Sequence, residues 1–149
     1  MLVVAFDNAY GDGDLVYDGG VLQSGASVET AALLSLFLDA PARPDDPVPE
    51  DAPRGGWWAD AYADDGDVTG SRLWVLSYYS ATGDAARFAE AAAREALQWM
   101  LDDGLAVEVI AEAARTDRNR IRLQVAIRKP GELAPSLLGA WDLEVGDAL

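Results

Sequence analysis

The feature that most constrains the fold of this chain is the alternation of apolar and polar residues in its last third. From Leu105 to Ala113 every second residue is apolar, and from Arg120 to Arg128 apolar residues alternate mainly with arginine and glutamine. Because neighbouring side chains of a strand point to opposite faces, each segment predicts a strand with one buried and one solvated face. The turn-forming residues 116–119 between the two segments predict an antiparallel β-hairpin.

Two registers of this hairpin place opposite charges across from each other on the solvated face. In one register Glu112 faces Arg122, and in the other Glu108 faces Arg128. Exposed cross-strand pairs contribute only about 0.2–1 kcal/mol each, so they select the register more than they stabilise the fold. Residues 140–145 also alternate and predict a third strand at an edge of the same sheet.

Three helices are expected before the hairpin. The first runs from about Val28 to Leu38, with Ser27 as its N-cap. A second, short helix is capped by Ser71 and ends near Tyr79, and a longer third helix covers 84–103, where apolar residues recur at three- and four-residue spacing until Gly104.

Short β-like runs at 2–6, 15–17 and 21–22 precede these helices, with turn residues such as 11–14 between them. The order of elements predicts an α+β fold, in which helices pack on one face of a mostly antiparallel sheet that has a C-terminal β-hairpin. A chain of 149 residues fits a single domain, 1–149. Five of its seven prolines lie in residues 40–54, which predicts an exposed Pro/Asp-rich loop.

The chain contains neither cysteine nor histidine. This composition excludes disulfides, thiolate chemistry and the serine–histidine pair, and it removes the commonest ligand of transition metals. An enzyme built from this chain has only carboxylates, tyrosine, serine and the single lysine, Lys129, for its chemistry.

Charge is distributed unevenly along the chain. The formal net charge is −15, and residues 1–70 carry fourteen acids against only Arg43 and Arg54. Nucleic acid is therefore not an expected partner. Six of the eleven basic residues lie between Arg115 and Lys129, which suggests head-to-tail self-association or an electropositive partner for the acidic half, although solubility of an acidic protein explains the charge equally well. No apolar run reaches the ~20 residues of a membrane span and the N-terminus is unlike a signal peptide, so we expect synthesis in the cytoplasm and no membrane partner.

Residues 55–74 place three of the five tryptophans beside four aspartates. Trp57 and Trp58 cannot both face inward from an extended strand, so one ring is expected to point outward. An indole ring is costly to leave in water. The surface that shields this ring from water is the chain's own core, another subunit or a stacked sugar, and the sequence leaves all three alternatives open.

The aspartates of this segment, Asp60, Asp64, Asp65 and Asp67, allow two chemical interpretations. They lack the ligand spacing of a helix-loop-helix calcium site, so solvated turn and cap residues explain them better than a metal. Two of them, such as Asp60 and Asp67, also supply the carboxylate pair that a glycoside hydrolase needs, but residue types alone do not establish that geometry. No catalytic, metal-binding or cofactor-binding residue is assigned, and no cofactor is expected.

The chain resembles a known family in three of its segments: the leucine- and phenylalanine-rich helix at 30–39, Gly-Trp-Trp-Ala-Asp at 56–60 and Gly-Ser-Arg-Leu-Trp at 70–74. These resemble the Mu-like phage tail baseplate protein family, which is similar in turn to the small baseplate wedge subunit of T-even contractile tails. The resemblance extends from about Leu15 to Ile127. The Pro-rich loop at 41–53 is longer than the family pattern, and the chain continues past the hairpin to Trp141.

The resemblance implies a structural subunit of a contractile phage tail baseplate, or of a prophage-derived one, and no enzyme. Such a subunit would lie in the virion tail baseplate and dock a larger wedge protein around the central hub, with other baseplate or sheath proteins nearby. An exposed hairpin edge can also accept a strand of another chain. The residues expected to bind partners are Trp57, Trp58, Asp60, Arg72, Trp74, Arg118, Arg120, Arg122 and Arg128. The alternative is a carboxylate-dependent, lysozyme-like glycan hydrolase that uses the Trp/Asp segment 57–67.

Overall fold

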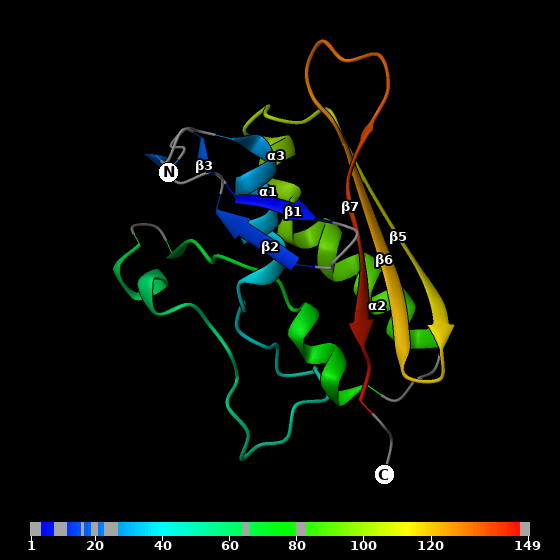
Figure 1. Ribbon diagram of the computed structural model, residues 1–149. Helices are drawn as coiled ribbons and strands as arrows, with labels where there is room; N and C mark the ends of the chain where they lie inside the picture. Colours follow the sequence, from blue (N-terminus) through cyan, green and yellow to red (C-terminus); the bar gives the residue numbers. More distant parts are fainter. Residues whose placement is uncertain are drawn as a thin grey trace.

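A computed structural model describes residues 4–7, 12–15, 17–18, 21–22, 27–63, 66–79 and 83–146 of the chain (Figure 1). The elements follow in the order β1 (Val4–Asp7), β2 (Asp12–Leu15), β3 (Tyr17–Asp18), β4 (Val21–Leu22), α1 (Val28–Phe37), η1 (Trp58–Tyr62), η3 (Leu73–Tyr78), α2 (Gly83–Ala96), α3 (Gln98–Asp102), β5 (Glu108–Asp117), β6 (Arg120–Arg128) and β7 (Ser136–Glu144). This is an α+β fold, as the sequence predicts.

The central sheet contains three antiparallel strands in the order β5-β6-β7. The hairpin of β5 and β6 takes the register in which Glu108 faces Arg128, one of the two alternatives drawn from the sequence. The third strand, β7, joins the edge of β6 but begins at Ser136, four residues before the predicted start.

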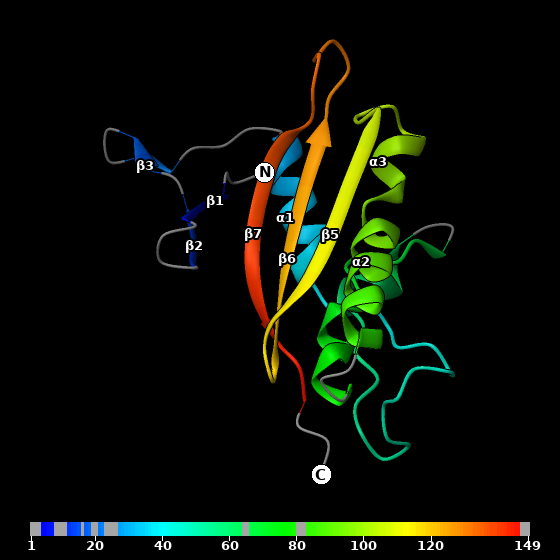
Figure 2. The same ribbon diagram turned by 90° about the vertical axis from the view of Figure 1, so that its right-hand side faces the viewer.

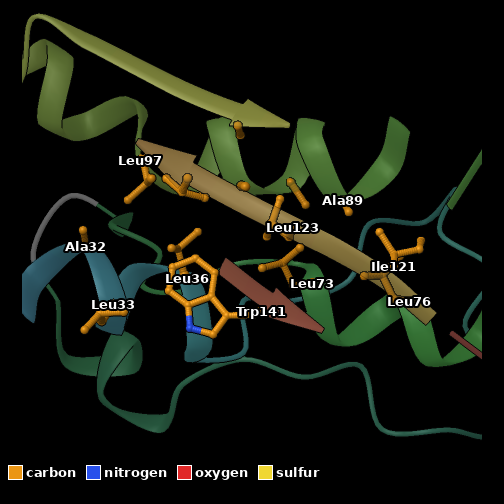
Figure 3. Close-up of a cluster of buried hydrophobic side chains, with 14 of the residues drawn as sticks. Ala32, Leu33, Leu36, Leu73, Leu76, Ala89, Leu97, Ile121, Leu123 and Trp141 are labelled. Atoms are coloured by element: carbon orange, nitrogen blue, oxygen red, sulfur yellow. The ribbon is translucent and has the colours of Figure 1, made fainter. Parts of the chain in front are cut away.

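Helices cover one face of this sheet. In Figure 2 the strands lie side by side with α1 behind them and α2 beside β5. The alanines of α2 allow its backbone to approach the sheet closely, because Ala85, Ala89, Ala92 and Ala93 are all buried. Figure 3 shows the core between the layers, which includes Leu36 of α1, Leu76 of η3, Leu97, and Leu123 and Trp141 of the sheet. The apolar positions of β6 face this core, as the alternation predicts.

Ser27 caps α1 as expected: its Oγ accepts a hydrogen bond from the backbone N–H of Thr30. The other two predicted helices differ from the structure. The helix expected from Ser71 is a 3₁₀ helix that begins at Leu73, with the Ser71 hydroxyl accepting from the N–H of Leu73. The long third helix is broken at Leu97, which is fully buried in the core between α2 and α3.

Strand β5 begins later than the alternation predicts. Leu105 and Val107 were expected to face the core, but both side chains are about half exposed and precede the strand. The backbone causes the difference, because α3 ends at Asp102 and the chain turns through Gly104 at a φ of 70° before it reaches the sheet.

The first strands only partly match the β-like runs. Pairing of β1 with β2, and of β3 with β4, forms two small antiparallel sheets. Residues 12–14, expected in a turn, belong to β2, because their backbone pairs with β1. The expected strand positions 2, 3 and 16, and the turn glycines 11, 19 and 20, lie outside the described residues.

The Pro-rich loop at 40–54 contains no helix or strand. It is not exposed throughout, however, because Asp46 and Val48 are buried. Asp46 tolerates burial because its carboxylate pairs with Arg72 and accepts the backbone N–H of Arg43. This loop is therefore attached to the body of the protein.

Candidate interaction surfaces

Residues 55–70, here called the aromatic loop, project from a fixed base on the segment after α1. At one end the backbone N–H of Gly56 donates to the carbonyl of Asp39, and at the other the N–H of Ser71 donates to the carbonyl of Leu38. Gly70 lies against the Leu38 backbone with a φ of 103°, so a side chain at this position would clash as well as strain the backbone. Both ends of the aromatic loop are thus held by the same short segment.

The two limbs of the aromatic loop are also bonded to each other. The Asp60 carboxylate accepts the backbone N–H of Thr69 at 3.0 Å. Asp60 belongs to η1, which turns the chain tightly directly after the tryptophan pair. The aspartate that the sequence predicts as a partner-binding residue therefore has a structural bond within the loop.

The rings of the aromatic loop face solvent. Trp58 is 74% exposed and Tyr62 is 83% exposed, whereas Trp57 is 38% exposed. The rings contact one another in sequence, with centroids 6.1 Å apart for Trp57 and Trp58 and 6.3 Å apart for Trp58 and Tyr62. The expectation that at least one indole points outward is confirmed, and a third ring, Tyr62, extends the group.

Trp74 supports the base of the aromatic loop. Its indole Nε1 donates to the carbonyl of Ala40 at 2.8 Å, and its ring fills the space beside Gly55. The ring also lines an open hollow of about 300 Å³ between α1, η3 and β7, together with Phe37 and Leu143. One edge of Trp74 thus holds the loop while another part of the ring remains accessible.

Arg72 is buried behind this base. Its guanidinium donates to Asp46 at 2.6 Å and to Glu95 at 3.0 Å, and it lies 5.3 Å from the centre of the Phe88 ring. Burial lowers the pKa of Arg72, but the bonds to Glu95 and Asp46 outweigh it, so the pKa is raised and the side chain stays charged. Both terminal nitrogens of the guanidinium are therefore bonded to these internal acids.

The arginines predicted on the hairpin lie on the solvated face of the sheet, but most are paired with acids of neighbouring strands. Arg122 forms two hydrogen bonds with Asp142 of β7, at 2.9 and 2.8 Å. Arg128 bonds Glu108 of β5 at 3.0 Å, and Arg120 lies 3.6 Å from Glu144. The hydrogen bond from Arg122 lowers the pKa of the Asp142 carboxyl. The row of arginines is thus largely neutralised within the sheet.

Arg118 differs from the other three. It occupies the turn between β5 and β6, and among the described residues its guanidinium forms no ion pair. Its backbone carbonyl accepts a bond from Arg115, so a second guanidinium lies at the same tip. The hairpin tip is the part of the hairpin where positive charge remains available.

The outer edge of β5 is covered by side chains of α2. Arg94 donates to the carbonyl of Ala111, and Glu90 accepts the backbone N–H of Ala113 at 2.9 Å. The two side chains also face each other, with 3.6 Å between their charged atoms. These bonds occupy the backbone groups with which a strand of another chain would pair, so the expected strand addition is blocked at the middle of this edge.

Five of the nine residues predicted to bind partners lie in or around the aromatic loop, and four lie on the hairpin. Sequence reasoning missed Tyr62 and Val68, two exposed apolar side chains of the same loop. The available signal was the aromatic residue four positions after Trp58, but η1 is a 3₁₀ helix, in which residues three apart share a face, so the spacing by itself did not predict the contact between the two rings.

No group of three or more acidic side chains in the described part of the chain is arranged to hold a metal ion. Asp64 and Asp65, considered above as possible ligands, lie outside that part. Among the described helices, none has both the length and the apolar character needed to cross a membrane.

Comparisons with known proteins identify the family. The family model described as phage protein GP46 matches residues 28–133, a range that includes α1, the aromatic loop and the hairpin. Baseplate protein gp46 of Escherichia phage Mu is 35% identical over 127 residues, which cover 84% of this chain and 86% of that protein. The Mu-like prophage FluMu protein gp46 of Haemophilus influenzae (strain ATCC 51907 / DSM 11121 / KW20 / Rd) is 33% identical over 120 residues, or 80% and 82% of the two chains. The chain therefore belongs to the Mu-like family of phage baseplate proteins, structural components of the virion tail.

Proposed function

We propose that this protein is a non-enzymatic docking subunit that attaches a larger wedge protein around the hub of a contractile tail baseplate. The observation that carries the proposal is the aromatic loop, whose three rings are exposed while its base and limbs are bonded in place. A loop held in this way presents its rings with little further ordering cost on binding.

Trp58 is the proposed anchor of this contact. Its ring is largely exposed and lies between Trp57 and Tyr62. Large aromatic side chains dominate the binding energy of protein interfaces, and their exposure in an isolated subunit is unfavourable. Burial of these rings by a neighbouring protein therefore explains why they stand at the surface.

The hairpin is the second proposed contact, limited to its tip. Arg118 is the residue there without an ion pair among the described residues, whereas Arg120, Arg122 and Arg128 are paired within the sheet. An acidic segment of another baseplate or sheath protein, or of a second copy of this chain, would therefore meet available positive charge at the hairpin tip rather than along the strands. We also propose that this chain is similar to the small wedge subunit of T-even contractile tails, as the sequence resemblance implies.

No observation favours the alternative glycan hydrolase. Asp60, the first of its two proposed carboxylates, is bonded to the backbone of Thr69 inside its own loop. A general acid or nucleophile needs its carboxylate directed at a bound sugar.

The proposal is tested with Trp58→Ala in a strain whose phage or prophage lacks its own copy of this gene. Loss of an interface anchor costs about 2 kcal/mol or more, so we expect the variant chain to be missing from sedimented tails. The folding free energy should change by no more than about 0.5 kcal/mol, because the ring is mostly exposed.

The matched control is Leu133→Ala, which removes a fully exposed apolar side chain from the loop between β6 and β7. This variant should be incorporated like the original chain. Normal incorporation of the Trp58→Ala chain would refute the aromatic loop as the docking surface.

A further inference from the structure

An acidic groove lies directly beside the aromatic loop. Its volume is about 440 Å³, and the residues that line it include Asp67, Val68, Thr69, Trp99, Asp102 and Asp103. One wall is the returning limb of the aromatic loop, and the opposite wall is the end of α2 together with α3. The groove therefore shares its loop wall, residues 67–70, with the aromatic loop that carries the exposed rings.

The walls of the groove are held in place. The indole Nε1 of Trp99 donates to the hydroxyl of Ser35 at 3.0 Å, and this hydroxyl donates to the carbonyl of Ala31. Thr69 on the other wall is tied to Asp60 and through it to η1. Each wall is thus tied by a hydrogen bond to a neighbouring element.

The charge of the groove is negative and not balanced by its own lining. Asp67, Asp102 and Asp103 are exposed at its rim, and none of the described residues that line it is basic. Asp102 is the last residue of α3 and Asp103 is its C-cap, at the helix end where backbone carbonyls already place partial negative charge. Negative charge at this position opposes helix stability, and the hydrogen bond that the Asp102 carboxylate accepts from the Gln98 amide at 3.0 Å needs an oxygen but no charge.

We propose that this groove receives an arginine of the partner segment that docks on the aromatic loop. A guanidinium fits the site chemically, because this one planar group can both donate hydrogen bonds to carboxylates and stack on an indole ring. Exposed Val68, which lines the groove as well as the loop, extends the surface for apolar residues beside that arginine. The partner segment is thus basic and apolar, and this inference rests on the docking function proposed above.

The test uses a blocked synthetic peptide of alternating arginine and leucine, with a peptide carrying glutamate in place of arginine as its counterpart. Isothermal titration calorimetry gives the affinity, and the indole N–H resonances of the tryptophans report where the peptide binds. We expect the arginine peptide to bind and to shift the Trp99 resonance, and the glutamate peptide not to bind.

The decisive variant is Asp102→Asn combined with Asp103→Asn. Asparagine preserves the acceptor that Gln98 uses on residue 102 and removes an unfavourable charge from the helix end, so the fold should be retained. The matched control is Glu50→Gln combined with Asp51→Asn, which removes two exposed charges from the Pro-rich loop. The groove variant should bind the arginine peptide about tenfold more weakly, and the control should bind it like the original chain.

The inference is overturned by equal weakening by both variants, by no weakening by the groove variant, or by absence of a Trp99 shift on binding. Self-association of the chain that is abolished both by Arg118→Glu and by the groove variant would show that the occupant is a second copy, which also overturns it. Failure of this inference is separable from failure of the docking function. If tails exclude the Trp58→Ala chain but incorporate the groove variant normally, the docking function stands and the arginine contact does not.

Discussion

Individual charged residues of this protein have mostly local partners, in spite of the large net charge. Lys129, the single lysine of the chain, bonds Glu29 in the first turn of α1 at 2.5 Å and lies 3.7 Å from Glu132. The bond to Lys129 is the main cause that lowers the pKa of Glu29 from 4.5 to about 2. This pair links the start of α1 to the end of β6, two elements far apart in the sequence.

The pair predicts a pH dependence of stability. Because the pKa of Glu29 is lower in the folded state, its contribution is present above pH 4.5 and is lost as the pH falls from 4.5 towards 2. Both side chains are at least one-third exposed, so the contribution should be no more than about 1 kcal/mol. Urea unfolding of Glu29→Gln, Lys129→Met and the double variant measures the coupling free energy between the two side chains. A coupling that persists unchanged at pH 2 would contradict this assignment.

At the scale of elements, α2 both covers the sheet and closes its β5 edge. Its alanine face packs on β5 and β6, while Glu90 and Arg94 bond the backbone of Ala113 and Ala111. A long edge strand with unpaired backbone groups is prone to pair with other chains. The helix therefore protects the isolated subunit from unspecific association.

Replacing both side chains, as Glu90→Ala with Arg94→Ala, should expose this edge. We expect a loss of about 1–2 kcal/mol of folding free energy from the two hydrogen bonds, and oligomers that grow with concentration. Urea unfolding and analytical ultracentrifugation measure the two effects. Asp84→Ala with Arg87→Ala is the control, because it removes an exposed ion pair from the same helix. If the edge variant remains monomeric at all concentrations, Glu90 and Arg94 do not protect the β5 edge from pairing with other chains.

At the scale of the whole molecule, the charge network around Arg72 joins three distant parts of the chain. Asp46 comes from the Pro-rich loop, Arg72 from the start of η3 and Glu95 from α2, and Arg43 adds a bond to Glu95 at 2.9 Å. Arg72 and Asp46 are buried, whereas Arg43 and Glu95 are more exposed. The network fixes the Pro-rich loop, and with it one side of the aromatic loop's base, to the helical layer.

Asp46→Ala should therefore destabilise the protein by about 3 kcal/mol, because it leaves the buried Arg72 with Glu95 alone. Asp45→Ala, at the exposed neighbouring position, should change the folding free energy by no more than about 0.5 kcal/mol. Thermal unfolding of the two variants decides the point: equal stability would show that the buried pair does not hold the loop.

Features with a local cause could be predicted from the sequence. The alternation in 120–128 predicted the buried face of β6, and Ser27 before an apolar helical pattern predicted the cap of α1. The register of the hairpin was limited to two choices by its opposite charges. The Gly-Trp-Trp-Ala-Asp and Gly-Ser-Arg-Leu-Trp segments predicted the family that the comparisons confirm. Each of these inferences depends on neighbouring residues or on a short motif.

Features that depend on contacts between distant residues were decided by the tertiary structure. The break at Leu97, the late start of β5 and the burial of Asp46 all follow from packing against other elements, which no local pattern contains. The arginines of the hairpin were recognised as outward-facing, but their pairing with Asp142 and Glu144 required β7 to join the sheet. The sequence by itself therefore determined the buried face of β6, the cap of α1 and the family, because periodicity, caps and motifs are local. The tertiary structure decided which charged and aromatic side chains remain available to a partner, because availability depends on what folds against them.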